Sequence, residues 1–167
     1  MMLGLLAVFL VSCDKDDDVD YDTYSVVYDV RENLVNSTGS NIDFVYGVYK
    51  KFETPLNNSD VVLIYRQDTS SGTAVWKLLP KTYYFEDGEL DYHFDFTAND
   101  IQIFADANFN LTTQSNAFKN QYLNNQIFRI VLVPASFGNK NNKVDYNDYE
   151  SVIKYYNINE TNVSVIK

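Results

Sequence analysis

The polar side chains best suited to chemistry stand at alternate positions of one segment, as Asp91, His93 and Asp95. Two carboxylates and an imidazole are ligands that Zn²⁺ and Mn²⁺ accept. In an extended strand, however, side chains two positions apart share a face but lie about 6.5–7 Å from each other. Three of them converge poorly on one ion unless a neighbouring strand adds a fourth ligand. The favoured prediction is therefore a solvated polar face, with no metal and no other cofactor.

Residues for nucleophilic catalysis are scarce in this chain. His93 is the only histidine and Cys13 the only cysteine, and no Gly-x-Ser-x-Gly nucleophile turn is present. No Gly-x-Gly-x-x-Gly segment follows an apolar strand-like run, which argues against dinucleotide binding. The sequence predicts that the protein is not an enzyme. A hydrolase or metal-dependent enzyme built around His93 is the less favoured alternative.

Aromatic residues make up 16% of the chain, with 14 tyrosines and 11 phenylalanines. Exposed aromatic rings on a β-sheet can stack against sugars, and the best candidates for such a ligand platform are Trp76, Tyr83 and Tyr84. Tyr83 and Tyr84 are consecutive, so in a strand they face opposite sides. The alternative is that these rings fill a strand-rich core and form cross-strand pairs.

The N-terminus carries a second pattern. Residues 1–12 are uncharged and almost all apolar, but too few to cross a bilayer as a helix. They end in Leu10, Val11 and Ser12, and Cys13 follows directly. This arrangement resembles the lipobox of bacterial lipoproteins. The resemblance implies that residues 1–12 are a signal peptide and that Cys13 carries fatty acyl chains which anchor the protein to a membrane.

The chain start departs from this pattern, because a secretory signal normally begins with Lys or Arg and Met1-Met2 supplies neither. We therefore expect the true start to lie upstream.

Residues 13–23 form an acidic tether after the lipid anchor. They hold six aspartates against one lysine, about half of the net charge of −10. Part of the tether resembles the surface-export signal of outer-membrane lipoproteins: Lys15, Asp16, Asp17 and Asp18. This resemblance implies an outer-membrane protein exposed at the cell surface. Asp14, directly after the cysteine, resembles an inner-membrane retention mark instead, so the choice of membrane stays open.

The remaining body is mildly acidic and has no cluster of Lys and Arg. Binding to nucleic acid is not expected, because phosphates require such clusters. The expected partners are a membrane, through the lipid anchor, and a glycan or a protein as ligand. The oligomeric state stays open.

These residues must be positioned by β-strands, because apolar residues recur with a period of two from residue 24 onward. Val61 to Tyr65 is apolar at every position, which predicts a central strand. Leu90 to Phe96 alternates apolar and polar residues, and Asp87-Gly88 before it favours a tight hairpin. Ile127 to Val133 is a further apolar run, broken only by Arg129.

One helix is predicted near the end, over about residues 146–156. Asp145 is expected to cap it and Asn157 to end it. Its apolar residues repeat at helical spacing, so this stripe must dock on the rest of the fold. We predict that residues 24–167 form a single, mainly β domain: an antiparallel β-sandwich, Ig-like in character, with one C-terminal α-helix.

The body also resembles a family of small uncharacterised bacterial surface lipoproteins. The shared segments are Ser59 to Arg66, Trp76 to Pro80, Gly88 to Tyr92, Phe94 to Phe96, Phe128 to Val131 and Asp145 to Asn147. Relatives sometimes carry a collagen-like stretch after the lipobox, where this chain has the aspartate run. The resemblance implies a non-catalytic binding or structural module of unknown ligand. A carbohydrate-binding accessory lipoprotein is the alternative.

Overall fold

A computed structural model of the chain describes residues 25–36, 44–57, 60–134, 144–161 and 163–166. Its elements are β1 (Val26–Glu32), β2 (Val35–Asn36), β3 (Val45–Lys51), β4 (Val61–Asp68), β5 (Val75–Leu78), β6 (Lys81–Phe85), β7 (Gly88–Phe96), β8 (Asp100–Ala107), α1 (Asn116–Tyr122), β9 (Gln126–Val133), α2 (Tyr149–Tyr156) and β10 (Ser164–Val165).

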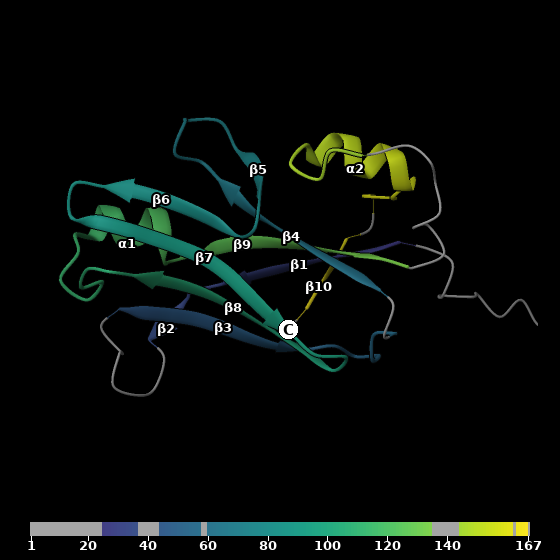
Figure 1. Cartoon of the computed structure of the whole chain (residues 1–167), viewed down its shortest axis with the longest axis horizontal. Helices are drawn as coiled ribbons and strands as arrows, with labels where there is room; N and C mark the ends of the chain where they lie inside the picture. The colour runs from purple at the N-terminus through teal and green to yellow at the C-terminus, as the bar shows by residue number, and fades with distance from the viewer. Residues whose placement is uncertain (1–24, 37–43, 58–59, 135–143, 162, 167) are drawn as a thin grey trace, which may run out of the picture.

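The strands form two five-stranded sheets (Figure 1). Sheet A has the order β10-β1-β9-β4-β5, and sheet B has the order β2-β3-β8-β7-β6. All neighbouring strands are antiparallel except β10, which runs parallel to β1 and pairs with Tyr28 and Asp29. The prediction of a mainly β, antiparallel sandwich with a C-terminal helix is confirmed.

The main core lies between the two sheets. Sheet A contributes Val30, Ile64 and Phe128, and sheet B contributes Tyr92 and Ile103, all of them buried. Strand β8 alternates buried and half-buried positions along its length, as a strand with one covered face must.

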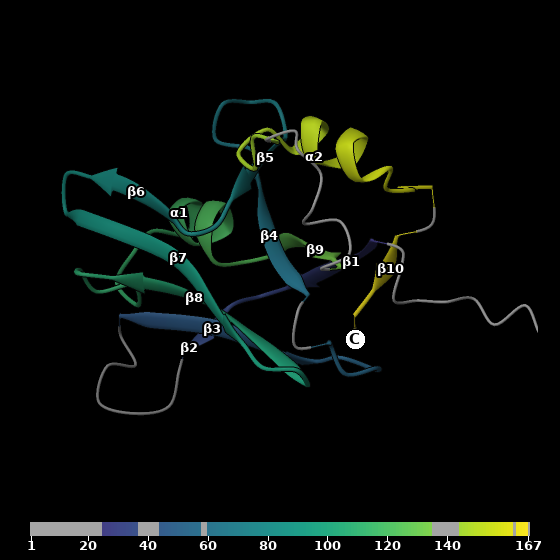
Figure 2. The ribbon, with the colours of Figure 1, turned by 45° about the vertical axis from the view of Figure 1, so that its right-hand side comes forward.

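Helix α2 makes a third layer on the outer face of sheet A (Figure 2). Leu63 and Tyr65 of β4 pack there against Val152 and Tyr156 of the helix. Strand β4 is therefore covered on both faces, which explains why the sequence from Val61 to Tyr65 shows no alternation.

The start of the C-terminal helix differs from the sequence prediction, whereas its end agrees with it. Helix α2 begins at Tyr149, three residues later than expected, because Asp148 caps it by accepting a hydrogen bond from the Ser151 N–H. The assignment of Asp145 as the cap was wrong: its carboxylate accepts the Asn147 N–H instead, in the turn before the helix. The helix does end at Asn157, which adopts a left-handed conformation.

Helix α1 was not predicted. Ser115 caps it, and its Phe118 and Tyr122 rings lie 5.2 and 5.1 Å from the Phe85 ring of β6. The short segment from Asn116 to Tyr122 has no long apolar stripe, so its helical state depends on this packing.

Candidate functional site

The three residues with metal-ligand chemistry lie on the outer face of sheet B. Asp91, His93 and Asp95 share that face of β7, opposite Asp106, Phe104 and Gln102 of β8. No helix of the described ranges lies over this face (Figure 2).

Each of the three side chains has a different environment. Asp91 accepts a hydrogen bond from the Thr82 hydroxyl at 2.5 Å. The His93 ring stacks on Phe104, with 4.8 Å between the ring centres and 18° between the planes. Asp95 is exposed. Among the residues that the structure describes, no group of three or more His, Cys, Asp or Glu side chains is arranged to hold a metal ion.

The predicted aromatic platform is not brought together. Tyr84 is 75% exposed on the outer face of sheet B, at its edge strand β6. Tyr83 faces the core and packs against Tyr92 and Tyr122. Trp76 lies on the outer face of sheet A beside helix α2, with its ring centre 5.5 Å from that of Tyr149.

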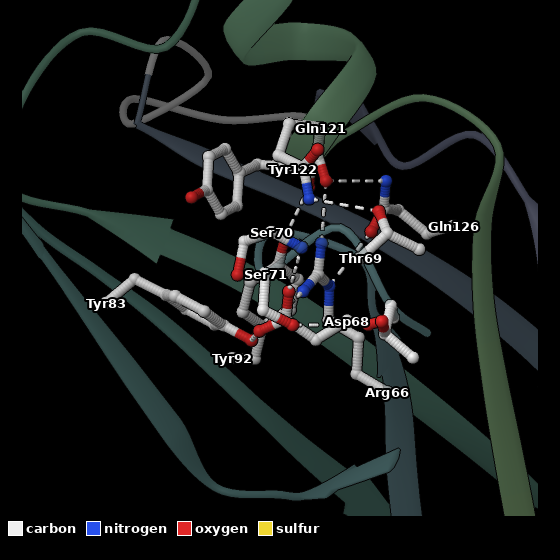
Figure 3. A network of polar contacts seen from close by, with 11 residues as sticks. Arg66, Asp68, Thr69, Ser70, Ser71, Tyr83, Tyr92, Gln121, Tyr122 and Gln126 are labelled. Carbon is white, nitrogen blue, oxygen red and sulfur yellow. Dashed lines mark hydrogen bonds and ion pairs between the residues drawn. The ribbon is translucent and has the colours of Figure 1, made fainter. Parts of the chain in front are cut away.

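A buried polar network around Arg66 is the feature that sequence reasoning missed (Figure 3). Arg66 is 1% exposed, and its Nε donates to Gln126 Oε1 at 2.9 Å. Its two terminal nitrogens donate to the Tyr83 hydroxyl at 3.0 Å and to the Gln121 carbonyl at 2.7 Å. The period-two pattern did contain the signal, because it places Arg66 on the same inward face as Ile64.

Tyrosine rings and one carboxylate complete this network. The Arg66 guanidinium carbon lies 4.7 Å from the Tyr92 ring centre and 5.4 and 5.6 Å from those of Tyr83 and Tyr122. Asp68 Oδ2 accepts the Tyr83 hydroxyl at 2.7 Å and lies 3.9 Å from Arg66.

The protonation states in this network follow from those contacts. Burial and the hydrogen bond to Asp68 raise the pKa of Tyr83 to about 12. For Asp68, burial alone opposes ionisation, but hydrogen bonds from Ser70 and Tyr83 and the charge of Arg66 hold its pKa below the ordinary value. Each nitrogen of Arg66 has a hydrogen-bond partner, and these bonds join α1, β4, β6 and β9. We therefore interpret the network as a structural one.

A second arginine fastens helix α2 to sheet A. Arg129 of β9 donates to both carboxylate oxygens of Asp29, at 2.8 and 3.2 Å. It also donates to the Tyr149 hydroxyl at 2.8 Å and to Glu160 at 2.5 Å. Its guanidinium carbon lies 4.5 Å from the centre of the Trp76 ring. The orientation of this tryptophan is therefore fixed from one side.

A cavity of about 290 Å³ opens next to Trp76, between β5 and the start of α2. It is lined by Ala74, Val75, Trp76, Asn147, Asp148, Tyr149 and Glu150. All of these residues lie inside the described ranges. The Glu150 N–H donates to the Asp148 carboxylate, whereas the Glu150 carboxylate itself makes no hydrogen bond or ion pair with any described residue, and neither does the indole N–H of Trp76. The cavity thus combines an oriented aromatic ring with a free acceptor and a free donor.

Larger hollows occur at the other end of the sandwich, around Tyr28 and Leu132, with volumes of about 420 and 320 Å³. Several residues along them are direct chain neighbours of segments outside the described ranges, such as Asn57, Asp60 and Pro134.

The lipobox Leu10, Val11 and Ser12, the lipidation site Cys13 and the export segment 15–18 lie outside the described residues. Within the described part of the chain, no helix has the length and apolar character needed to cross a membrane. Comparison of the sequence and structure with family models, with curated proteins and with solved structures finds no match.

Proposed function

We propose that this protein is a lipid-anchored, surface-exposed binding module without catalytic chemistry, and that it holds its ligand in the cavity between β5 and α2. The observation that carries the binding role is the position of Trp76, the only tryptophan, in the wall of a cavity that offers unpaired polar groups. Binding sites combine apolar surface with a few placed polar groups in this way.

The anchored location is supported by the sequence around Cys13. The apolar run, the lipobox and the acidic tether occur in the order that resembles bacterial lipoproteins. Two or three acyl chains on one residue give durable membrane attachment, whereas a single chain does not.

The location is tested by growing cells that express the full open reading frame with radiolabelled palmitate. We expect the label to enter the protein, the Cys13→Ser variant to lose it, and protease added to intact cells to remove the body. Absence of label, or label that does not depend on Cys13, would contradict the anchoring.

The binding role is tested separately with the purified full chain in detergent. Because Trp76 is the only tryptophan, its emission reports on the cavity directly. We expect at least one class of small ligand to change this emission saturably and to raise the unfolding temperature, since a ligand that binds only the folded state stabilises it. If a broad panel of sugars, peptides and metabolites changes neither quantity, the cavity is not the binding site.

A further inference from the structure

We propose that the cavity beside Trp76 binds a neutral saccharide, with one pyranose ring stacked on the indole. This inference rests on the proposed binding function and names its ligand class. It is carried by three observations: the fixed orientation of the ring, the charges around it and the unpaired polar groups beside it.

The Trp76 ring is held in place before any ligand arrives. The guanidinium carbon of Arg129 lies 4.5 Å from the centre of the Trp76 ring. Arg129 is itself held by hydrogen bonds to Asp29 and Tyr149. The Tyr149 ring contacts the indole as well. A flat apolar surface that needs no rearrangement suits the C–H face of a sugar ring, because little conformational entropy is lost on binding.

The charges around the ring disfavour an anionic ligand. Asp148 and Glu150 line the cavity, so an anion meets like charge there. The Arg129 guanidinium beside the ring does not offset this, because its own charge is already balanced by Asp29 and Glu160. A neutral ligand avoids this repulsion.

The unpaired groups match the hydroxyls of a sugar. The Glu150 carboxylate accepts hydrogen bonds only, and the Trp76 indole N–H donates only. A hydroxyl group does both, so neighbouring hydroxyls of one ring can satisfy the two residues at once. The cavity volume of about 290 Å³ is at the small end for ligand sites. It therefore fits one ring or the terminal unit of a longer glycan.

The experiment follows Trp76 emission in the full chain in detergent during titration with galactose, glucose, lactose and cellobiose. Glucuronic acid serves as the anionic counterpart of the same size. We expect at least one neutral sugar to bind saturably and glucuronic acid to bind at least about tenfold more weakly. A glycan array then separates free sugars from the ends of longer chains as the preferred form.

Variants test the named residues by calorimetry, which does not depend on the tryptophan signal. Glu150→Gln removes an exposed, unpaired carboxylate without touching the core, and we expect affinity to fall about tenfold. Trp76→Ala should abolish detectable binding, whereas Trp76→Phe keeps an aromatic face and should retain part of it. Tyr84→Ala, which removes an exposed ring from the other sheet, is the matched control and should bind like the wild type.

The experiments distinguish failure of the saccharide inference from failure of the proposed binding function. If a peptide or metabolite changes Trp76 emission while no sugar does, the binding function stands and the saccharide inference fails. The inference also fails if glucuronic acid binds as well as the neutral sugars, or if Glu150→Gln and Trp76→Ala both bind a sugar with wild-type affinity.

Discussion

The guanidinium carbon of Arg66 lies 4.7 Å from the centre of the Tyr92 ring, in the core between the two sheets. Both residues are less than 2% exposed. A charge at this depth is tolerated because each nitrogen has a partner and because Asp68 balances it. The four elements that supply these partners depend on Arg66 for their arrangement.

Replacing this arginine alone should be severely destabilising. We expect Arg66→Met to lower the free energy of unfolding by about 3–5 kcal/mol, because Asp68 is then left buried without its countercharge. Urea denaturation of the full chain measures the loss. Arg31→Met is the matched control: the Arg31 side chain is exposed, and its partner Asp29 is buried but keeps its ion pair with Arg129, so the same substitution should cost about 0–1 kcal/mol. Equal losses in the two variants would contradict a special role for Arg66.

Asp68 makes stability depend on pH in the acid range. Its pKa is lowered in the folded state, so its stabilising contribution is complete above the unfolded value of about 4 and is lost as the pH falls through the folded value. We expect the difference in the free energy of unfolding between wild type and Asp68→Asn, measured by urea denaturation, to be constant from pH 7 to pH 5. This difference should become smaller below pH 4. A difference that does not depend on pH would show that Asp68 acts through its size and not its charge.

Tyr83 gives the opposite dependence in the alkaline range. Its pKa is raised to about 12, so the neutral hydroxyl stabilises the fold fully below the ordinary tyrosine value near 10. That contribution is lost as the pH rises through 12. In an ultraviolet titration of the folded protein, Tyr83→Phe should remove one ionisation near pH 12. Loss of an ionisation at a clearly lower pH would contradict the assignment.

Asp148 caps helix α2, whereas Asp145 lies in the turn before it, so the two residues should contribute differently to stability. Asp148→Ala removes the acceptor for the Ser151 N–H, and we expect the unfolding temperature to fall by about 2–4 °C. Asp145→Ala, the control, affects only the preceding turn and should change the temperature by less than half as much. A larger effect at Asp145 would support the cap that the sequence pattern favoured.

Two glycines in turns should respond differently to alanine. Gly88 has φ of +142°, and a Cβ there would come within 1.9 Å of the Asn108 side-chain oxygen. Gly72 has φ of +83° but open space around it. We expect Gly72→Ala to cost about 1–2 kcal/mol from backbone strain alone. Gly88→Ala should cost more than Gly72→Ala, and urea denaturation of both variants checks the order.

The sheets were predictable from the sequence because period-two alternation follows directly from strand geometry. Leu90 and Tyr92 are buried while Asp91 and His93 are not, as their spacing indicated. A tight hairpin was also expected here from Asp87-Gly88. The hairpin is present, but its two turn residues are Glu86 and Asp87, and Gly88 begins β7 opposite Phe85.

The tertiary features were not predictable in this way. Helix α1 forms because its rings pack on Phe85, a residue about thirty positions earlier. Both Asp145 and Asp148 fit the local pattern of an N-cap, so the sequence alone does not distinguish them. The packing of Tyr149 against sheet A accompanies the start of the helix at that residue, with Asp148 as its cap. The cavity beside Trp76 joins two segments about seventy residues apart, and no local spacing reports that proximity.

Strand β10 has a consequence for proteins crowded together on one surface. It occupies the middle of the outer edge of β1, where it pairs with Tyr28 and Asp29, and Ile166 donates to the Asp29 carbonyl. An open strand edge invites the main chain of a neighbouring molecule. Because β10 already pairs with the middle of β1, only two short stretches of this edge can pair with a second copy. Residues 164–166 therefore reduce edge-to-edge aggregation.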